Sequence, residues 1–322
     1  MKTVFRLVLL ALACLPFGQA LAQDAWPSRP IRIVVVFPPG GASDIVARVL
    51  AEVIAPRLNA RIVVDNRPGA GGTVGALHVA QQPADGYTLM LTNNAPIVTS
   101  PPIYRNVGYD PMRGFTHIAY IGATPLLVVS NPGLPARDMA GLQAWLRAQR
   151  GPVFGSSGVG SVGHILGSMF SARTGIALEH APYRGSQPMQ ADLLSGAIML
   201  SFDPLPDNVE NVRAGRLRAY AVSAARRNPL LPEVPTLAEA GVPNLVAENF
   251  LGLSAPAGLP PSIAARLHAE VNWALTRPAL LERLNQFGVT PEARSQADFV
   301  AFLQDQVDTV SAAVAALNLS VN

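Results

Sequence analysis

The chain has 322 residues, with 24 Lys or Arg against 21 Asp or Glu, which gives a net charge of +3. The basic residues form no tail or stripe that would suit a nucleic acid. Lys2 is the only lysine, which excludes a Schiff-base lysine, a P-loop and a pyridoxal enzyme from the rest of the chain. At this length the chain can bury one large core or two ordinary ones.

The first 22 residues have the pattern of a cleavable secretory signal peptide. Two basic residues precede an apolar run over residues 7–17, and residues 20–22 fit the small-x-small rule for cleavage after Ala22. The apolar run is about half the length that a membrane span requires. We therefore expect an exported, periplasmic protein, which has lost Cys14, its only cysteine, and thus has neither a disulfide nor a thiol nucleophile.

Residues 33–48 run from an apolar strand through a Pro-Pro-Gly-Gly turn into a helix, which is typical of an anion site. The first N–H groups of a helix lack internal partners and carry the positive end of its dipole. The turn could also be only a tight connection, and either Ser43 or Asp44 could cap the helix. Capping suits Asp44 better, because a carboxylate pointing into an anion site would repel the ligand. The candidate ligand-binding residues are Pro39, Gly40, Gly41, Ala42 and Ser43.

Apolar strands alternate with helical stretches along most of the chain, which is typical of parallel sheets covered by helices. After residue 258, apolar residues recur at one-turn spacing, so helices are expected from Ile263 to Leu275 and from Phe299 to Leu317. The expected segments before them are 31–37, 45–58, 62–64, 74–80, 87–91, 142–148, 153–155, 165–174, 176–181, 188–194, 198–202 and 217–222.

The fold class expected from this pattern is α/β with two domains. Extended stretches at residues 125–132 and 245–255 separate the two α/β units. The last helices need a sheet face to cover, so we expect the chain to return to its first domain. Domain I would then comprise residues 23–127 and 243–322, and domain II would be residues 128–242, with two crossing strands as a hinge over a cleft.

A second strand, Gly/Ser loop and helix start follow at residues 153–165. The loop spells GxGxxG, which resembles a dinucleotide fingerprint, but its mid-chain position and the export of the protein argue against that cofactor. We prefer a carboxylate at this helix start, and we expect no cofactor. The expected donors are Ser156, Ser157, Gly158 and Ser161, together with His164, which could instead be a packing or capping residue.

Polar residues at the ends of two other strands are further candidates. Thr92 and Asn93 lie at a carboxyl edge, where open parallel sheets bind ligands, although Asn is also a common turn residue. Tyr183, Arg184 and Gly185 also follow a strand. Tyr183 could form a wall of the cleft, and Arg184 could either pair with a carboxylate or remain solvated.

Three other features complete the set of candidates. Asp203 follows the strand 198–202 and would suit an amino or hydroxyl group of a ligand if it points into the cleft, or it could cap a helix. The glycine loop at 66–72 has no Lys or Mg²⁺ partner nearby, so we assign it to structure. No metal is expected, because no metal-ligand spacing is found among His78, His117, His180 and His268.

Eight stretches, in order and in register, carry a family resemblance. The sequence resembles the substrate-binding proteins of tripartite tricarboxylate transporters, the Bordetella uptake gene (Bug) family, along essentially its whole length. The stretches are WPSRPIRIVVVFPPGGASDIVAR (26–48), VDNRPGAGGTVGA (64–76), PADGYTLMLTNN (83–94), FGSSGVGSVGHI (154–165), APYRGSQPMQADLLSG (181–196), LRAYAVSAARR (217–227), LPEVPTLAEAGVP (231–243) and SAPAGLPPSI (254–263).

The resemblance implies a periplasmic-binding-protein fold of type II-like topology, whose two lobes close on a small carboxylate. It also implies delivery of that ligand to the membrane subunits of a transporter, and no enzymatic activity. We expect a monomer. Two other functions stay open at this point: a sensor component that signals to a membrane receptor or kinase, and a periplasmic hydrolase, although the chain has no GxSxG motif.

Overall fold

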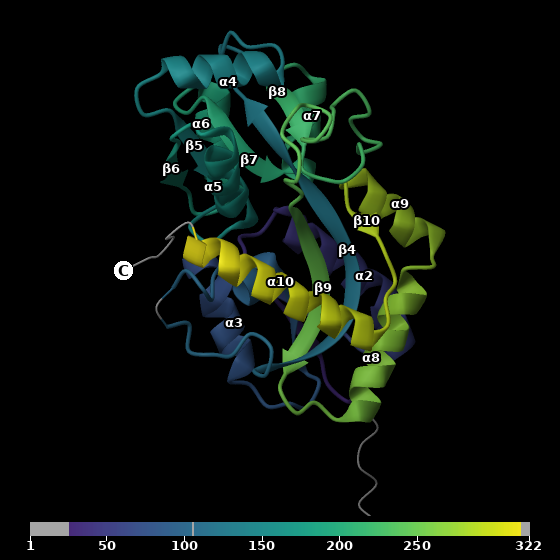
Figure 1. Ribbon diagram of the computed structural model, residues 1–322. Coiled ribbons are helices and arrows are strands. Elements are labelled where there is room, and N and C mark those ends of the chain that lie inside the picture. The colour runs from purple at the N-terminus through teal and green to yellow at the C-terminus, as the bar shows by residue number, and fades with distance from the viewer. Residues whose placement is uncertain (1–25, 105, 317–322) are drawn as a thin grey trace, which may run out of the picture.

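The computed structural model describes residues 26–104 and 106–316, so the signal peptide expected at residues 1–22 lies outside the described residues. The chain forms an α/β structure with two lobes, which lie one above the other in Figure 1. Among the described residues, none of the helices combines the length and the apolar character needed to cross a membrane.

The first lobe contains the strands β1 (Ile31–Val35), β2 (Ile62–Asn66), β3 (Thr88–Asn93), β9 (Glu248–Pro256), β10 (Thr290–Pro291) and the first part of β4 (Phe115–Ser130). β1 pairs in parallel with β2 and β3, whereas β9 lies antiparallel between β3 and β4. The short strand β10 pairs with β4. The first lobe therefore has a mixed sheet in the order β2-β1-β3-β9-β4.

Helices cover both faces of this sheet. They are α2 (Ala42–Leu58), α3 (Thr73–Ala80), α8 (Pro261–Ala274), α9 (Pro278–Gln286) and α10 (Gln296–Ala316), with a 3₁₀ turn η1 (Ala70–Gly72) and a π-helical turn η2 (Ala95–Thr99). On one face α2 and α8 enclose an apolar core around Ile33 and Leu267. On the other face Phe299 of α10 packs with Phe250 and Met90. Residues from both ends of the chain thus build this lobe.

The second lobe contains β5 (Val153–Ser156), β6 (Glu179–Pro182), β7 (Leu200–Pro204) and β8 (Arg218–Val222), with the helices α4 (Met139–Ala148), α5 (Val162–Thr174), α6 (Ser186–Ser195) and α7 (Leu205–Arg213). β5 pairs in parallel with β6 and β7. Leu142 and Phe170 pack on one face of this sheet, and Met189 and Val209 pack on the other. Each parallel strand is followed by a helix that begins at the same edge of the sheet.

Strand β4 belongs to both sheets. It pairs with β9 from Phe115 to Pro125 and with β7 from Leu126 to Ser130, so one continuous strand extends from the first lobe into the second (Figure 1). The chain returns to the first lobe at β9. The lobes also touch beside the cleft, where the hydroxyl of Thr99 donates to the carbonyl of Gly160 and the hydroxyl of Tyr104 donates to the carbonyl of Val159, at 3.4 Å.

Candidate functional site

The turn after β1 leads into α2 without a side-chain cap. The N-cap is Gly41, and the first helical hydrogen bond runs from the N–H of Ile45 to its carbonyl, at 3.1 Å. The expectation that Ser43 or Asp44 is the N-cap is therefore wrong, because the helix already begins at Ala42. The N–H groups of Ala42, Ser43 and Asp44 lie in the uncapped first turn, which is the electropositive end of the helix.

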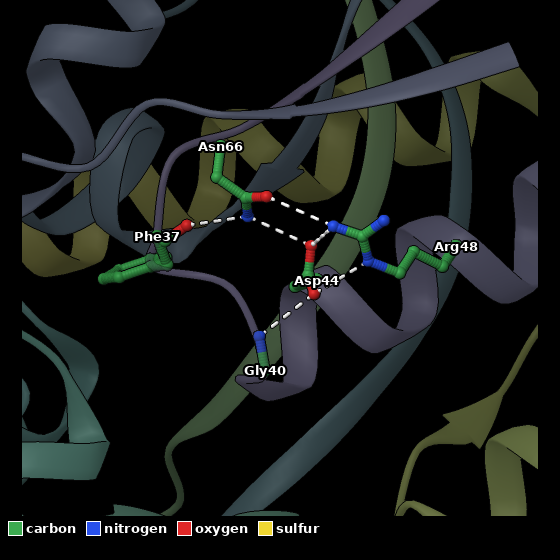
Figure 2. A network of polar contacts seen from close by, with 5 residues as sticks. All are labelled: Phe37, Gly40, Asp44, Arg48 and Asn66. Atoms are coloured by element: carbon green, nitrogen blue, oxygen red, sulfur yellow. Dashed lines mark hydrogen bonds and ion pairs between the residues drawn. The ribbon is translucent and has the colours of Figure 1, made fainter.

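Asp44 instead fixes the turn, as Figure 2 shows. Its carboxylate accepts a hydrogen bond from the N–H of Gly40, at 3.0 Å. It also forms a bidentate ion pair with Arg48, in which both N–O distances are 2.9 Å. The amide of Asn66 donates to Asp44 and to the carbonyl of Phe37, at 3.0 Å each. Burial acts to raise the pKa of Asp44, but these donors and the Arg48 charge hold it below its usual value. The negative charge is thus neutralised inside the loop.

The second Gly/Ser loop follows β5 and ends in an N-cap. The hydroxyl of Ser161 accepts the N–H of His164, and Nδ1 of His164 accepts the N–H of Gly160, at 3.2 Å each. Ser156 lies 2.7 Å from Nε2 of His180, and the two histidine rings stack with centroids 4.0 Å apart. Burial lowers the pKa of His164 to about 4 and that of His180 to about 3. Both rings are therefore neutral at neutral pH and have partners within the protein.

The turn between β6 and α6 is tied to this loop. The N–H of Gly185 donates to the carbonyl of Ser157, at 3.0 Å, and that of Tyr183 to the carbonyl of Ser156, at 3.1 Å. The hydroxyl of Tyr183 donates to Asp192, at 2.7 Å, so its tip is bound to α6. Burial, followed by the Asp192 contact, raises the pKa of Tyr183 to about 12. The side chain of Arg184 is exposed.

These loops from the two lobes enclose two adjoining cavities. They share Phe37, Pro38, Ser157, Arg184 and Gly185 in their walls. The small cavity, of about 100 Å³, is also lined by Pro39, Gly41, Ala42, Ser43, Ser186, Gln187, Pro188, Pro204, Asp207 and Asn249. The large cavity, of about 600 Å³, is also lined by Val36, Pro68, Gly69, Ala70, Gly71, Gly72, Tyr104, Gly158, Val159, Pro182 and Tyr183.

Most of the candidates from the first turn and the α6 turn line these cavities, whereas several others lie behind the walls. The residues outside both linings are Gly40, Thr92, Asn93, Ser156, Ser161, His164 and Asp203. Thr92 donates to Ser254 of the neighbouring strand, and Asn93 bonds to Ser43 and to the N–H of Ala95. These two side chains therefore support the walls from within the first lobe.

The sequence had suggested that Asp203 follows the strand, but the structure places it inside β7. Its side chain is fully buried and accepts hydrogen bonds from Ser186, at 2.8 Å, from Asn208, at 2.8 Å, and from Gln190, at 3.4 Å. Burial and the neighbouring Asp207 carboxylate raise the pKa of Asp203. The side chain of Asp203 therefore lies between α6 and α7 and outside the lining of both cavities.

Two features of the cavities were missed from the sequence. The glycine loop at 66–72 was assigned above to structure, but its residues 68–72 line the large cavity. Asp207, in the first turn of α7, lines the small cavity. The glycines were a usable signal for the loop, but an Asp in a first helical turn is common and carried no such signal. Within residues 26–104 and 106–316, no three His, Cys, Asp or Glu side chains are grouped so that they could hold a metal ion.

Comparison with known proteins identifies the family. The model of the family described as "Tripartite tricarboxylate transporter family receptor" (TctC) matches residues 46–319. Protein BugT of Bordetella pertussis is 36% identical over 289 residues, which cover 89% of each chain. A UPF0065 protein of Pseudomonas sp. strain P51, from the tcbD-tcbE intergenic region, is 38% identical over 273 residues, 84% of this chain and 81% of the relative.

Solved structures match over nearly all of their length. Rpa4515 of R. palustris, solved with adipate, has a TM-score of 0.88 at 32% identity, and the match covers 92% of this chain and 100% of the other. MatC of Rhodopseudomonas palustris, with bound malate, has a TM-score of 0.84 at 28% identity, with 90% and 100% covered. The periplasmic binding protein BugD has a TM-score of 0.86 at 29% identity, with 92% and 100% covered. The chain therefore belongs to the TctC family of tripartite tricarboxylate transporter receptors and has the two-lobed fold of periplasmic binding proteins.

Proposed function

We propose that the protein captures a small carboxylate in the cleft between its lobes and delivers it to the membrane subunits of a tripartite tricarboxylate-type transporter. The observation that carries this proposal is the uncapped start of α2, which faces Ser157 and Arg184 of the other lobe across a shared cavity. The adipate and malate in the related structures support the ligand class.

The donors in the small cavity suit an anion. The first N–H groups of α2 are fixed dipoles, which lose little entropy when a carboxylate binds. Ser43 and Ser157 add hydroxyl groups, and Arg184 adds a positive charge from the second lobe. Micromolar binding requires about 8 kcal/mol, and a few charge-assisted hydrogen bonds together with the exclusion of water can reach this value.

Closure of the lobes would complete the donor set. We place the domains at residues 23–127 with 243–322 and at residues 128–242, with β4 and the chain entering β9 as the hinge. A carboxylate would dock on α2 in the open form, and the second lobe would then bring Ser157 and Arg184 to it. The proposal includes a periplasmic location after removal of residues 1–22, a monomeric state and no nucleic-acid partner.

The proposal also assigns no catalytic activity to the cleft. Ser156 and His180 form a contact that resembles part of a hydrolase triad. However, Ser156 is fully buried, and burial lowers the pKa of His180 to about 3, far below the range suited to a general base at neutral pH. Neither residue lines the cavities. The geometry thus supports capture rather than turnover of a ligand.

A calorimetric and thermal-shift screen of residues 23–322 tests this function. Mono-, di- and tricarboxylates should be compared with uncharged amides of the same size, and only acids should raise the melting temperature by mass action. Gly41→Val should abolish binding and leave the fold intact, because Gly41 lines the small cavity and has an ordinary φ of −81°. Gly40 is a poorer choice, since its φ is +84° and a Cβ there would meet no atom within 4 Å.

Two results would contradict the capture of a carboxylate in this cleft. One is a broad panel in which no carboxylate binds, and the other is unchanged affinity in Gly41→Val, which would place the ligand elsewhere. Turnover of esters or amides by the purified protein would contradict the absence of catalysis.

A further inference from the structure

Asp207 brings an acidic group into a cavity that is otherwise suited to anions. It lies in the first turn of α7 and is one of only two formally charged residues in the lining of the small cavity, the other being Arg184. Ala42 and Ser43, at the start of α2 in the other lobe, line the same cavity. A carboxylate of the protein itself therefore shares the cavity with the helix start that would receive the ligand.

The backbone around Asp207 is held in place by the second lobe. The amide of Gln190 donates to the carbonyl of Asp207. The next residue, Asn208, donates to Asp203, at 2.8 Å, and to the carbonyl of Pro204, at 2.9 Å. The main chain at Asp207 cannot move away from the cavity unless the first turn of α7 breaks these bonds. The backbone that carries the Asp207 side chain is thus fixed at the cavity wall.

The surroundings of Asp207 leave its charge poorly compensated. Burial raises its pKa, and the nearby donor groups of Ser186 and Ala42 offset only part of this rise. The buried carboxyl of Asp203 lies behind it, and Asp207 contributes to the raised pKa of Asp203 through charge repulsion. This is opposite to Asp44, which has Arg48 as a partner. Asp207 therefore gains from any further hydrogen-bond donor placed in the cavity.

These contacts have different consequences for two classes of ligand. A carboxylate bound to the first turn of α2 leaves the remainder of the ligand near Asp207, because both groups line the same cavity. A second carboxylate would then meet a like charge at short range, which disfavours binding. A hydroxyl or ammonium group at that place would instead donate to Asp207.

We propose that Asp207 determines the specificity of the cleft: it rejects dicarboxylates and selects monocarboxylates that carry a hydroxyl or ammonium donor at their far end. This inference rests on the proposed carboxylate-binding function, and it separates this protein from its adipate- and malate-bound relatives. An ordinary acid in a first helical turn would stabilise α7 through the helix dipole and would have no effect on ligand choice.

Isothermal titration calorimetry with ligands of matched length tests this assignment. For chains of three to six carbons, the α,ω-dicarboxylate, the ω-hydroxy acid and the ω-amino acid are titrated into the wild type, Asp207→Asn and Asp207→Ser. The wild type should bind the best donor-bearing acid at least tenfold more tightly than the dicarboxylate of the same length. Both variants should lower this ratio at least tenfold, mainly by binding the dicarboxylate more tightly.

Glu210→Gln is the matched control, because Glu210 lies on the same helix with its side chain 81% exposed and outside both cavities. It should leave the ratio unchanged. A ratio that is equal in the wild type and both Asp207 variants overturns the inference and leaves the carboxylate-binding function standing. A shift in melting temperature without a change in ratio identifies Asp207 as a structural acid only and also overturns it. If no acid binds to any variant, the proposed function itself fails.

Discussion

Asp44 lies in the first turn of α2 and Asp207 in the first turn of α7, and their charges have different surroundings. Asp44 is enclosed by Arg48, Asn66 and the N–H of Gly40, so its charge is used to shape the turn. Asp207 lines the same cavity as this helix start, from the opposite lobe. Local sequence made the role of Asp44 foreseeable in part, since Asp, Ser and Asn are common at helix starts. The role of Asp207 depends on how the two lobes meet, which no local pattern encodes.

Buried histidines should make the protein sensitive to acid. Burial lowers the pKa of His117 and His164 to about 4 and that of His180 to about 3, whereas an unfolded histidine titrates near 6.5. The folded state therefore binds fewer protons than the unfolded state below pH 6.5. Their contribution is fully present above about pH 6.5 and is lost as the pH falls toward 4, at up to about 1.4 kcal/mol per pH unit for each histidine.

Urea unfolding of the wild type and His180→Gln between pH 8 and 4.5 measures this effect. Asp203 and Asp207 act in the opposite direction, because a raised carboxyl pKa gives stability that is lost as the pH rises. The comparison of the two proteins isolates the histidine contribution. The free energy of unfolding of the variant should fall less steeply below pH 6.5, and parallel curves would contradict the assigned role of His180.

At the level of elements, the alternation of apolar strands and helices predicted most of the fold, because short buried strands and amphipathic helices differ in their hydrophobic period. The first part of β4 was not foreseen. Its sequence contains Gly122 and Pro125, which usually interrupt a strand, but here the register shifts near His117 and Gly122 accommodate the irregularity. The contacts of Thr92 and Asn93 could not be predicted from the sequence either, because their partners come from β9 and α2.

The positions of the two glycine loops could be predicted from the sequence, but which of their residues line the cavities could not. Both loops lie where the sequence placed them, between a strand and a helix. In the second loop, however, the hydroxyls of Ser156 and Ser161 bond to each other and to residues of the same lobe. Only the segment from Ser157 to Val159 lines the large cavity. Whether a hydroxyl faces the cleft depends on side-chain packing against α5 and β6, which is a tertiary property.

The close contact between η2 and the second loop leads to a prediction about closure. A Cβ at Gly160 would lie 2.6 Å from the hydroxyl oxygen of Ser100 in the other lobe, and the φ of Gly160 is +76°. Gly160→Ala should therefore oppose the closed form and weaken carboxylate binding at least tenfold, mainly through faster dissociation. Gly160 lines neither cavity, so the substitution does not fill ligand space.

Gly215→Ala is the matched control for this experiment. Gly215 has a similar φ of +68°, and a Cβ there would meet no atom within 4 Å. It carries the same kind of backbone strain without a contact between lobes. Stopped-flow binding should show a change in Gly160→Ala alone, and equal dissociation rates in both variants would mean that the contact between Ser100 and Gly160 has no part in closure.

On the scale of the whole molecule, closure should be visible as a change in size. A compact chain of about 300 residues has a radius of gyration of about 19 Å. Small-angle scattering of the monomer should give a slightly larger value without ligand, because the lobes separate, and a smaller value once a carboxylate is bound. The same radius in both states, under conditions where calorimetry shows saturation, would contradict the hinge. A mass twice that of the chain would contradict the monomer.

The continuous course of β4 has a consequence for how the protein denatures. Its 16 residues supply hydrogen bonds to β9 at one end and to β7 and β8 at the other. Unfolding of either lobe would remove hydrogen-bond partners from β4, which also forms part of the sheet in the other lobe. Heat should therefore disrupt both lobes in a single cooperative transition, even though each has its own apolar core. The strand that we propose as part of the hinge should thus also prevent the lobes from being thermodynamically independent.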